Sequence, residues 1–292
     1  MMTSVNSMAW SRLTLTGQFT LDAPLRIGGG AEGLVLDGAG KPVIPASSFR
    51  GALRAAVESA LRGLADPHQE TRYTVTLRGP DGRPTPTTRT VKVCCDSVDK
   101  RDDDLNYQGC LTGAIVNRWQ ADTLLRSQLD SALVEGTCQV CRLFGTPWLA
   151  GRVYLADLPV IKDSWNGTLV TRGGLSISRD TDTAIEGSLY QRQAVPAGTR
   201  FQFHLVVENA SDVEQGMILL GLRPFELGWV ALGSDRARGL GRGRLVIDWW
   251  NCRYVDSDHL IGALLVGTDP QVFAETDAEA RINALVAALR TP

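Results

Sequence analysis

The sequence predicts an α+β fold in which one antiparallel sheet carries its helices on a single face. Two segments, 12–21 and 198–209, alternate apolar and polar residues as half-buried strands do. Each is followed by a segment with apolar residues at helical spacing, from about 49 to 62 and from about 213 to 227. We find no repeat with a period of about 20 to 50 residues, which disfavours a solenoid or a propeller.

The first strand and the first helix are the clearest elements. In RLTLTGQFTL the apolar side chains alternate with threonines, and Gly17 is a candidate β-bulge. The segment KPVIP then leads to a helix that is expected to begin at Phe49, with Ser47 or Ser48 as its N-cap. The apolar residues that predict the buried sides of these two elements are Leu13, Leu15, Phe19, Leu21, Phe49, Leu53, Val57 and Leu61.

The second half of the chain repeats the strand and helix order. The segment RVYLADLPV reads as a strand, and in GTRFQFHLVVEN the residues Phe201, Phe203, Leu205 and Val207 share one face. After the second helix come a strand, a loop rich in glycine and arginine, and a further strand, and a capped amphipathic helix ends the chain. This β-α-β and β-α-β order is that of ferredoxin-like folds and RNA recognition motifs (RRMs).

Two long polar segments interrupt this skeleton, so we expect one domain over 1–292 with two insertions. In the first, 66–145, proline, threonine, arginine and aspartate dominate at the start, which indicates a hairpin, and a helix is expected over about 118–133. The second, 162–198, is irregular as far as about 186. The expected fold is thus a modified ferredoxin-like fold with large insertions.

Composition excludes some classes and leaves others open. The formal net charge is −2, and no apolar run is long enough to span a membrane or to form a signal peptide, so we expect a cytoplasmic protein without a membrane partner. Of the 30 basic residues only four are Lys. Arginine pairs with phosphate through two parallel hydrogen bonds and stacks on bases, which suits RNA, but a GC-rich genome explains the same bias equally well.

The glycine triplet 28–30 does not form a nucleotide site. Neither a Walker loop nor a dinucleotide fingerprint is present, because an extended segment separates the glycines from the next helix. The second glycine loop, GSDRARGLGRGRL, is different, because glycine frees backbone N–H groups beside arginine side chains. Such a loop can hold a sugar-phosphate chain without reading bases, although a solvated hairpin is the alternative. Its arginines are Arg236, Arg238, Arg242 and Arg244.

Two arginines of the first helix extend this expectation. Arg50 and Arg54 are four residues apart and are predicted on the exposed side of the helix. There they would contact phosphates, and the partial positive charge of the helix N-terminus would add to their effect.

Cysteines and acidic residues suggest metal sites. Cys138-x-x-Cys141 has metal-ligand spacing, and Cys94 or Cys95 together with Cys110 would complete a tetrahedral zinc site, with buried free thiols as the alternative. We expect Cys252 to lie in the core. Near the first loop, Asp22, Glu32 and Asp37 are candidates to hold a divalent metal or a ribose hydroxyl, although a turn role is favoured for Asp37. The three histidines suggest no catalytic triad.

Several fragments in a fixed order resemble one family. They are LRIGGG, GKPVIPASSFRGALR, CQVCRLFG, RVYLADL, LSISRDTDTAIEGSLYQRQAVPAGTRFQF and LGSDRARGLGRGRL. This series is similar to the RAMP superfamily backbone subunits of type III CRISPR effector complexes, and the resemblance runs from about Leu13 to Leu245.

The resemblance implies an RRM-like subunit that stacks with other effector subunits along a CRISPR RNA and its complementary target RNA, in antiviral RNA-guided defence. The segment LSISRDTDTAIEGSLYQ, which contains Arg179, resembles the thumb hairpin that wedges into the guide-target duplex. The positions that resemble the guide grip are Ser47, Ser48, Arg50, Arg54 and the loop with Arg236, Arg238 and Arg242, and Arg26 stands before I-G-G. Related subunits carry a zinc element before L-F-G, which implies a zinc-bearing lid.

One departure from the family pattern concerns catalysis. Asp37 matches the second aspartate of the cleaving members, but Ala31 occupies the cleaving position, with Glu32 beside it. We therefore expect an RNA-binding backbone subunit. The alternative is a metal-dependent endoribonuclease that cuts target RNA with Glu32 or Asp37 and a divalent metal such as Mg²⁺. A CRISPR RNA processing nuclease is a weaker third reading, because no general base can be assigned.

Overall fold

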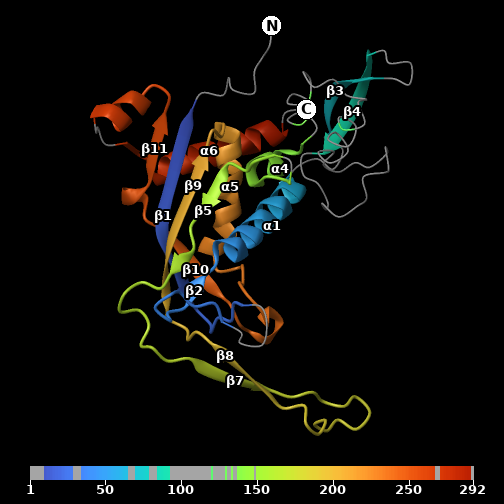
Figure 1. Cartoon of the computed structure of the whole chain (residues 1–292), viewed down its shortest axis with the longest axis vertical. Helices are drawn as coiled ribbons and strands as arrows, with labels where there is room; N and C mark the ends of the chain where they lie inside the picture. The colour runs from blue at the N-terminus through green and yellow to red at the C-terminus, as the bar shows by residue number, and fades with distance from the viewer. Residues whose placement is uncertain are drawn as a thin grey trace.

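We describe the chain from a computed structural model (Figure 1). The structure describes residues 10–28, 34–64, 70–78, 84–92, 120, 129, 133, 137–147, 149–266 and 270–290, of which 70–78 and 84–92 are described by their backbone.

The central sheet is antiparallel and is built around the first strand. Strand β1 (Ser11–Leu21) pairs along its whole length with β9 (Arg200–Glu208), so that Leu15 lies opposite Leu205. The other edge of β1 pairs with β10 (Gly243–Ile247) near its end and with β11 (Arg253–Asp256) near its start. The strands β5 (Val153–Leu155) and β12 (Gln271–Val272) form the two edges.

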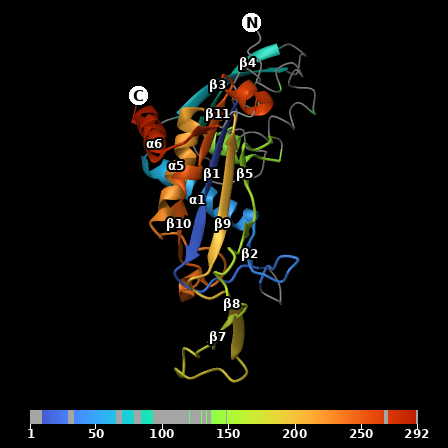
Figure 2. The ribbon, with the colours of Figure 1, turned by 90° about the vertical axis from the view of Figure 1, so that its left-hand side faces the viewer.

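The long helices all cover one face of this sheet. They are α1 (Ala46–Leu64), α5 (Asp212–Glu226) and α6 (Glu275–Arg290), and Figure 2 shows the sheet nearly edge-on with α5 and α6 on its left. The strand order β10-β1-β9-β5, with α1 after β1 and α5 after β9, is the ferredoxin-like topology. The predicted α+β class is therefore confirmed, with β11, β12 and α6 added at the C-terminal end.

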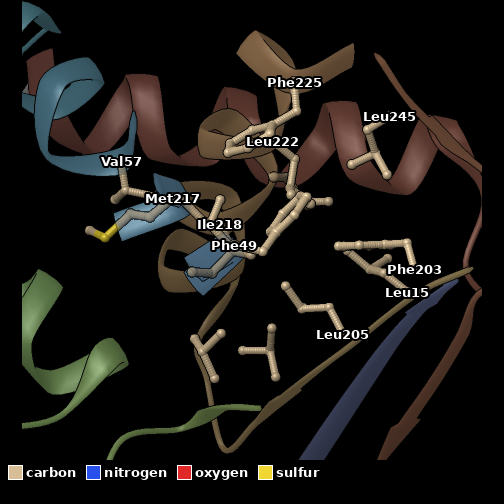
Figure 3. Packing of buried hydrophobic residues seen from close by; sticks show 14 of the residues in the cluster. Leu15, Phe49, Val57, Phe203, Leu205, Met217, Ile218, Leu222, Phe225 and Leu245 are labelled. Carbon is tan, nitrogen blue, oxygen red and sulfur yellow. The ribbon is translucent and has the colours of Figure 1, made fainter. Parts of the chain in front are cut away.

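An aromatic cluster joins α1 to the sheet and to α5. Phe49 has no exposed surface, and its ring stacks on Phe225 with centroids 4.6 Å apart. Its centroid lies 5.4 Å from that of Phe203 in β9 and 5.9 Å from that of Phe19 in β1, which it meets edge to face. Figure 3 shows Phe49 between side chains of α5 and the strand residues Leu15, Phe203 and Leu205. The predicted apolar faces of these elements are thus confirmed.

Two glycines in α5 allow the helices to approach closely. A Cβ atom at Gly216 would lie 2.3 Å from the carbonyl oxygen of Arg281 in α6, and one at Gly221 would lie 2.3 Å from Cγ2 of Val57 in α1. A third glycine does the same in the sheet. Gly17 pairs regularly with both neighbouring strands, so the predicted bulge is wrong. A Cβ atom there would meet the carbonyl oxygen of Val246 at 2.3 Å, so the glycine allows β1 and β10 to lie close together.

A capping box fixes the start of α5. The hydroxyl of Ser211 accepts a hydrogen bond from the backbone N–H of Glu214, and the carboxylate of Glu214 accepts one from the backbone N–H of Ser211. Burial alone would raise the pKa of Glu214, but the hydrogen bond and charge of Arg152 outweigh it, so its pKa lies below the usual value. The buried carboxylate is therefore charged and paired.

The first helix starts earlier than expected, and a distant side chain caps it. The helix includes Ala46, so Ser47 and Ser48 lie in its first turn and the predicted N-cap role is wrong. Instead, the carboxylate of Asp157 accepts a 2.7 Å hydrogen bond from the backbone N–H of Ala46. Asp157 follows β5, where RVYLADLPV divides into β5 and β6 (Leu158–Pro159), and β6 pairs with β2 (Val43–Ile44).

Both insertions contain hairpins. Strands β3 (Glu70–Arg78) and β4 (Pro84–Lys92) pair in the first, while the helix predicted over 118–133 lies mostly outside the described residues. The second insertion forms β7 (Val170–Gly174) and β8 (Tyr190–Ala194), a long hairpin that projects from the end of the sheet away from both chain termini (Figure 1). No helix in the described part of the chain is long and apolar enough to cross a membrane.

Replacing Gly216 with alanine tests the close packing of α5 on α6. We expect Gly216→Ala to lower the free energy of unfolding by about 2 kcal/mol, because the methyl group overlaps a backbone carbonyl. Gly51→Ala is the matched control in α1, where nothing lies within 4 Å, and should raise stability by about 0.5 kcal/mol. Urea unfolding of the two variants measures the difference, and equal effects would contradict this packing.

Candidate nucleic-acid interface

Three loop segments meet at one end of the sheet. Leu25, in the loop after β1, exchanges two 2.8 Å backbone hydrogen bonds with Val195, just after β8. The carbonyl of Arg26 accepts from the N–H of Ser234 at 2.9 Å, and that of Pro24 accepts from Gly241 at 2.8 Å. Figures 1 and 2 both show the base of the hairpin beside this end of the sheet. The first loop, the hairpin base and the glycine-arginine loop (232–242) thus form one surface.

The glycine-arginine loop has a backbone path that side chains would block. Gly233 has φ +77° and Gly241 has φ +82°, and a Cβ atom would lie 2.2 Å from the carbonyl oxygen of Arg26 and 1.9 Å from that of Leu232, respectively. The short 3-10 helix η3 (Arg236–Arg238) lies between them. Gly233 therefore lets this loop pack onto the first loop, and Gly241 lets the two ends of the loop pack together. The arginines of the loop are exposed.

The predicted arginines of this surface differ in their internal contacts. Arg236 and Arg242 are exposed, and within the described part of the chain their side chains make no hydrogen bond or ion pair. Arg26 is half-buried, and its Nη1 lies 3.4 Å from the hydroxyl of Ser234. Arg244 pairs with Asp22, with Nε and Oδ2 3.3 Å apart. Two guanidinium groups are thus available to an external anion.

The hairpin carries exposed apolar side chains toward its tip. Leu189 is 70% exposed and Ile177 is 60% exposed, and both belong to the part of the hairpin beyond β7 and β8. Arg179 is exposed and lies in the turn at the tip, between the bridged residues Ile177 and Ala184. A projecting hairpin with uncovered apolar side chains is suited to insertion between stacked groups.

The expectation that Arg50 and Arg54 lie on the exposed side of α1 is wrong. Both are held against α4 (Gln139–Phe144): a guanidinium N–H of Arg50 donates to the carbonyl of Phe144. Burial, and then the charge of Arg54, lower the pKa of Arg50. Arg54 is 24% exposed and contacts both Glu58 and the sulfur of Cys141, at 2.9 and 3.1 Å. These two arginines therefore anchor α4, while Ser47 beside them is exposed.

Asp37, an acidic residue of the first loop that the structure describes, stabilises a turn. One carboxylate oxygen of Asp37 accepts hydrogen bonds from the backbone N–H groups of Ala39 and Lys41, at 2.8 and 2.9 Å, so Asp37 holds a turn, as the sequence favours. Glu32 lies outside the described residues. Within the ranges described above, no three His, Cys, Asp or Glu side chains are grouped to hold a metal ion.

Two of the four predicted zinc ligands lie together. Cys138 is the N-cap of α4, and its sulfur accepts a hydrogen bond from the backbone N–H of Cys141 at 3.4 Å. Both side chains are buried. Cys94 and Cys110 lie outside the described residues. Cys252 is fully buried, which confirms its place in the core.

Three residues of this surface were not predicted from the sequence: Tyr190, Arg192 and Asp235. Tyr190 and Arg192 in β8 contact Asp235 and Arg238 in the glycine-arginine loop. The period-two pattern of YQRQA places Tyr190 and Arg192 on one face, but it does not reveal what that face meets. The contacts join residues more than 40 positions apart in the sequence.

The family comparison covers the same region of the chain. Residues 18–244 match the model of the RAMP superfamily, which is well over half of the 292 residues, so the chain belongs to that superfamily. Proteins of this family are CRISPR-associated, bind RNA and act in multi-subunit complexes, and membership places this chain in that class. Among curated proteins, none matches the sequence.

A pair of glycine variants tests the path of the glycine-arginine loop. Gly241→Ala should cost about 3 kcal/mol of stability, because it adds a backbone overlap to the strain of a positive φ. Gly239→Ala has nearly the same φ, +81°, but nothing lies within 4 Å, so it should cost only about 1 kcal/mol. Urea unfolding gives both costs, and hydrogen exchange should show lost protection at the amide of Leu232 in Gly241→Ala alone. Equal costs would refute this path.

Proposed function

From its membership of the RAMP superfamily, we propose that this protein is a CRISPR RNA-binding backbone subunit of a type III CRISPR effector ribonucleoprotein. It holds the guide and the complementary target RNA for antiviral RNA-guided defence, beside other subunits of the complex. The observation that carries the proposal is the single surface where the first loop, the glycine-arginine loop and the hairpin base meet, with Arg236 and Arg242 exposed.

The chemistry of this surface suits a sugar-phosphate chain. Arginine donates two parallel hydrogen bonds to a phosphate, and glycine allows a backbone to approach a ligand without a side chain in between. Such contacts recognise shape and charge, so that base pairing between guide and target reads the sequence. A net charge of −2 for the whole chain is compatible with this, because the basic groups are concentrated locally.

The open face of the sheet does not favour base stacking. In many RRM proteins aromatic side chains on the two central strands stack on bases. Here the outward residues of the central strands β1 and β9 include threonine, glutamine and histidine but no aromatic residue: Thr14, Thr16, Gln18, Gln202 and His204. This favours RNA contact through the loops at the end of the sheet.

The hairpin supplies the second part of the proposed function. Its exposed side chains, Leu175, Ile177, Ile185 and Leu189, would insert between base pairs of the guide-target duplex, where apolar surface leaves water. Arg179 at the tip would contact the backbone of the duplex. We assign no cleavage reaction to this subunit, because Ala31 occupies the position of the cleaving aspartate in the family pattern.

A structural zinc ion is a further part of the proposal. Cys138 and Cys141 would bind it together with Cys94 and Cys110. The guanidinium of Arg54 lies 3.1 Å from the sulfur of Cys141, and a positive neighbour favours the thiolate that zinc requires. Zinc would then join the earlier part of the first insertion to α4, which Arg50 and Arg54 of α1 contact.

Elemental analysis tests the zinc site. The purified protein should contain about one zinc per chain, and Cys138→Ser should lose it. Cys252→Ser is the control, because that thiol donates to the carbonyl of Asp248 within the core, 3.3 Å away, and should leave the metal content unchanged. A protein without zinc, or equal zinc in both variants, would refute the site.

Removing the two exposed loop arginines tests the RNA grip. Replacing both Arg236 and Arg242 with alanine should weaken binding of single-stranded RNA by about 30-fold at low salt, and should lower the slope of log affinity against log salt by about 1.4, because two phosphate contacts are lost. Arg12→Ala is the control: Arg12 is equally basic but lies at the opposite end of β1, paired with Glu208. Fluorescence anisotropy titrations at several salt concentrations measure both quantities.

The same titration can refute RNA binding by Arg236 and Arg242. If the double variant and Arg12→Ala bind RNA equally with equal slopes, this surface does not hold RNA. Arg50→Ala and Arg54→Ala are less informative, because loss of their contacts with α4 would also disturb the fold.

A further inference from the structure

Four side chains fasten the base of the hairpin to the glycine-arginine loop. We call this group the latch, and its members are Tyr190, Arg192, Asp235 and Arg238. Tyr190 and Arg192 lie on the same face of β8. Asp235 immediately precedes η3, and Arg238 is the last residue of η3. Each contact within the latch is made between groups that the structure describes in full.

The carboxylate of Asp235 bridges the strand and the loop. Its Oδ2 lies 2.5 Å from Nη1 of Arg192, and its Oδ1 lies 3.3 Å from Nη1 of Arg238. The side chain of Asp235 is only 12% exposed and that of Arg192 is 35% exposed, so this pair is less screened by water than surface ion pairs are, whereas Arg238 is 61% exposed. The two arginines therefore meet at one shared acid.

The ring of Tyr190 contacts the same two arginines. The guanidinium carbon of Arg192 is 4.7 Å from the ring centroid and that of Arg238 is 5.5 Å from it, both within the range of cation-π attraction. Arg238 also donates a hydrogen bond to the hydroxyl of Tyr190. Tyr190 is thus held by the loop on its face and at its hydroxyl.

The hairpin is shaped to admit this ring. Gly174 lies directly opposite Tyr190 in the β7-β8 pair, and a Cβ atom there would come within 2.3 Å of the ring and its hydroxyl. Two pairs further along, Arg172 lies opposite Arg192, and two positive charges opposite each other weaken a strand pair. Asp235 offsets that repulsion from the neighbouring loop.

Asp235 takes a backbone conformation that needs support. Its φ is +57°, in the left-handed region that non-glycine residues rarely adopt. Such a conformation persists where the surroundings hold it, and it recurs at functional sites. Here the ion pairs with Arg192 and Arg238 provide the support.

We propose that the latch is a positioning device: it sets the orientation of the hairpin relative to the glycine-arginine loop before RNA arrives. The inference rests on the proposed RNA-binding function and adds Tyr190, Arg192 and Asp235 as positioning residues. A hairpin that is already in place loses no further freedom when RNA binds, which raises affinity. The apparent affinity falls in proportion to the fraction of molecules whose hairpin is in place.

One glycine variant disturbs the latch without changing a charge. Gly174→Ala should displace the ring of Tyr190, because the new methyl group overlaps it. Gly173→Ala, one residue earlier in the same strand, meets nothing within 4 Å and is the matched control. Tyr190→Ala removes the ring itself, and combining it with Gly174→Ala tests whether the glycine acts through the ring.

The first measurement needs no RNA. A fluorophore attached through a non-natural amino acid at position 181, near the hairpin tip, reports the amplitude of hairpin motion by time-resolved anisotropy. We expect larger motion in Gly174→Ala and Tyr190→Ala than in the original chain, and no change in Gly173→Ala. If Gly174→Ala behaves as Gly173→Ala does, the latch does not fix the hairpin and the proposal is wrong.

The second measurement uses a labelled duplex of a guide RNA and its complementary target RNA at several salt concentrations, because the hairpin is proposed to enter that duplex. Gly174→Ala and Tyr190→Ala should each weaken binding by about tenfold, with an unchanged salt slope, because neither variant removes a phosphate contact. The double variant should bind no more weakly than Tyr190→Ala alone. Increased motion without weaker binding would overturn the positioning role, and so would a lowered salt slope in Gly174→Ala.

Failure of the latch and failure of the proposed function are distinguishable. If the original chain does not bind the RNA, the proposed function and the positioning role both fail, while hairpin motion still reports whether the contacts of the latch hold. If the original chain binds RNA and all four variants bind equally, the proposed function stands and the positioning role is wrong.

Discussion

The packing of Phe49 is the contact on which the remaining structure depends. Its ring stacks on Phe225 near the end of α5 and meets Phe203 and Phe19 in the two central strands. The start of α1 and the end of α5 are therefore fixed to the same region of the sheet. Since the first loop precedes α1 and the glycine-arginine loop follows α5, one aromatic cluster brings both to the same end of the molecule. Burying such a side chain stabilises the fold by about 2 to 3 kcal/mol. Because the same contact positions the two loops, it also determines the surface that they form.

The periodic elements could be predicted from the sequence, and the long-range contacts could not. Alternation predicted β1 and β9, and four-residue spacing predicted the buried face of α1, because both patterns report burial along one element. The same patterns did not show which distant residue caps a helix or which group pairs with a polar side chain. The cap of α1 comes from Asp157, which is 111 residues away, and the partner of Arg50 is a carbonyl 94 residues away. Arg50 was expected on the exposed side because a helical stripe shows which residues are polar, not which polar residues face a neighbouring helix.

The candidate site, too, could be predicted from the sequence only in part. The glycine-arginine loop was recognisable, because interleaved glycine and arginine have a direct chemical meaning next to phosphate. The bridging role of Asp235 was not, since an aspartate in such a loop usually makes a turn. Acidic residues hold some arginines in place, as Asp235 holds Arg192, and leave Arg236 and Arg242 exposed. In our account this division of labour, between arginines that position and arginines that bind, forms a rigid RNA-binding surface on a chain of nearly neutral charge.

Ultraviolet cross-linking to RNA followed by peptide mass spectrometry tests the central claim most directly, because it locates the RNA without changing the protein. The account predicts that cross-linked peptides come from the loop after β1, the glycine-arginine loop and the β7-β8 hairpin. Cross-links that fall instead on the outer surfaces of α5 and α6, or on β11 and β12, with none in these three segments, would contradict it.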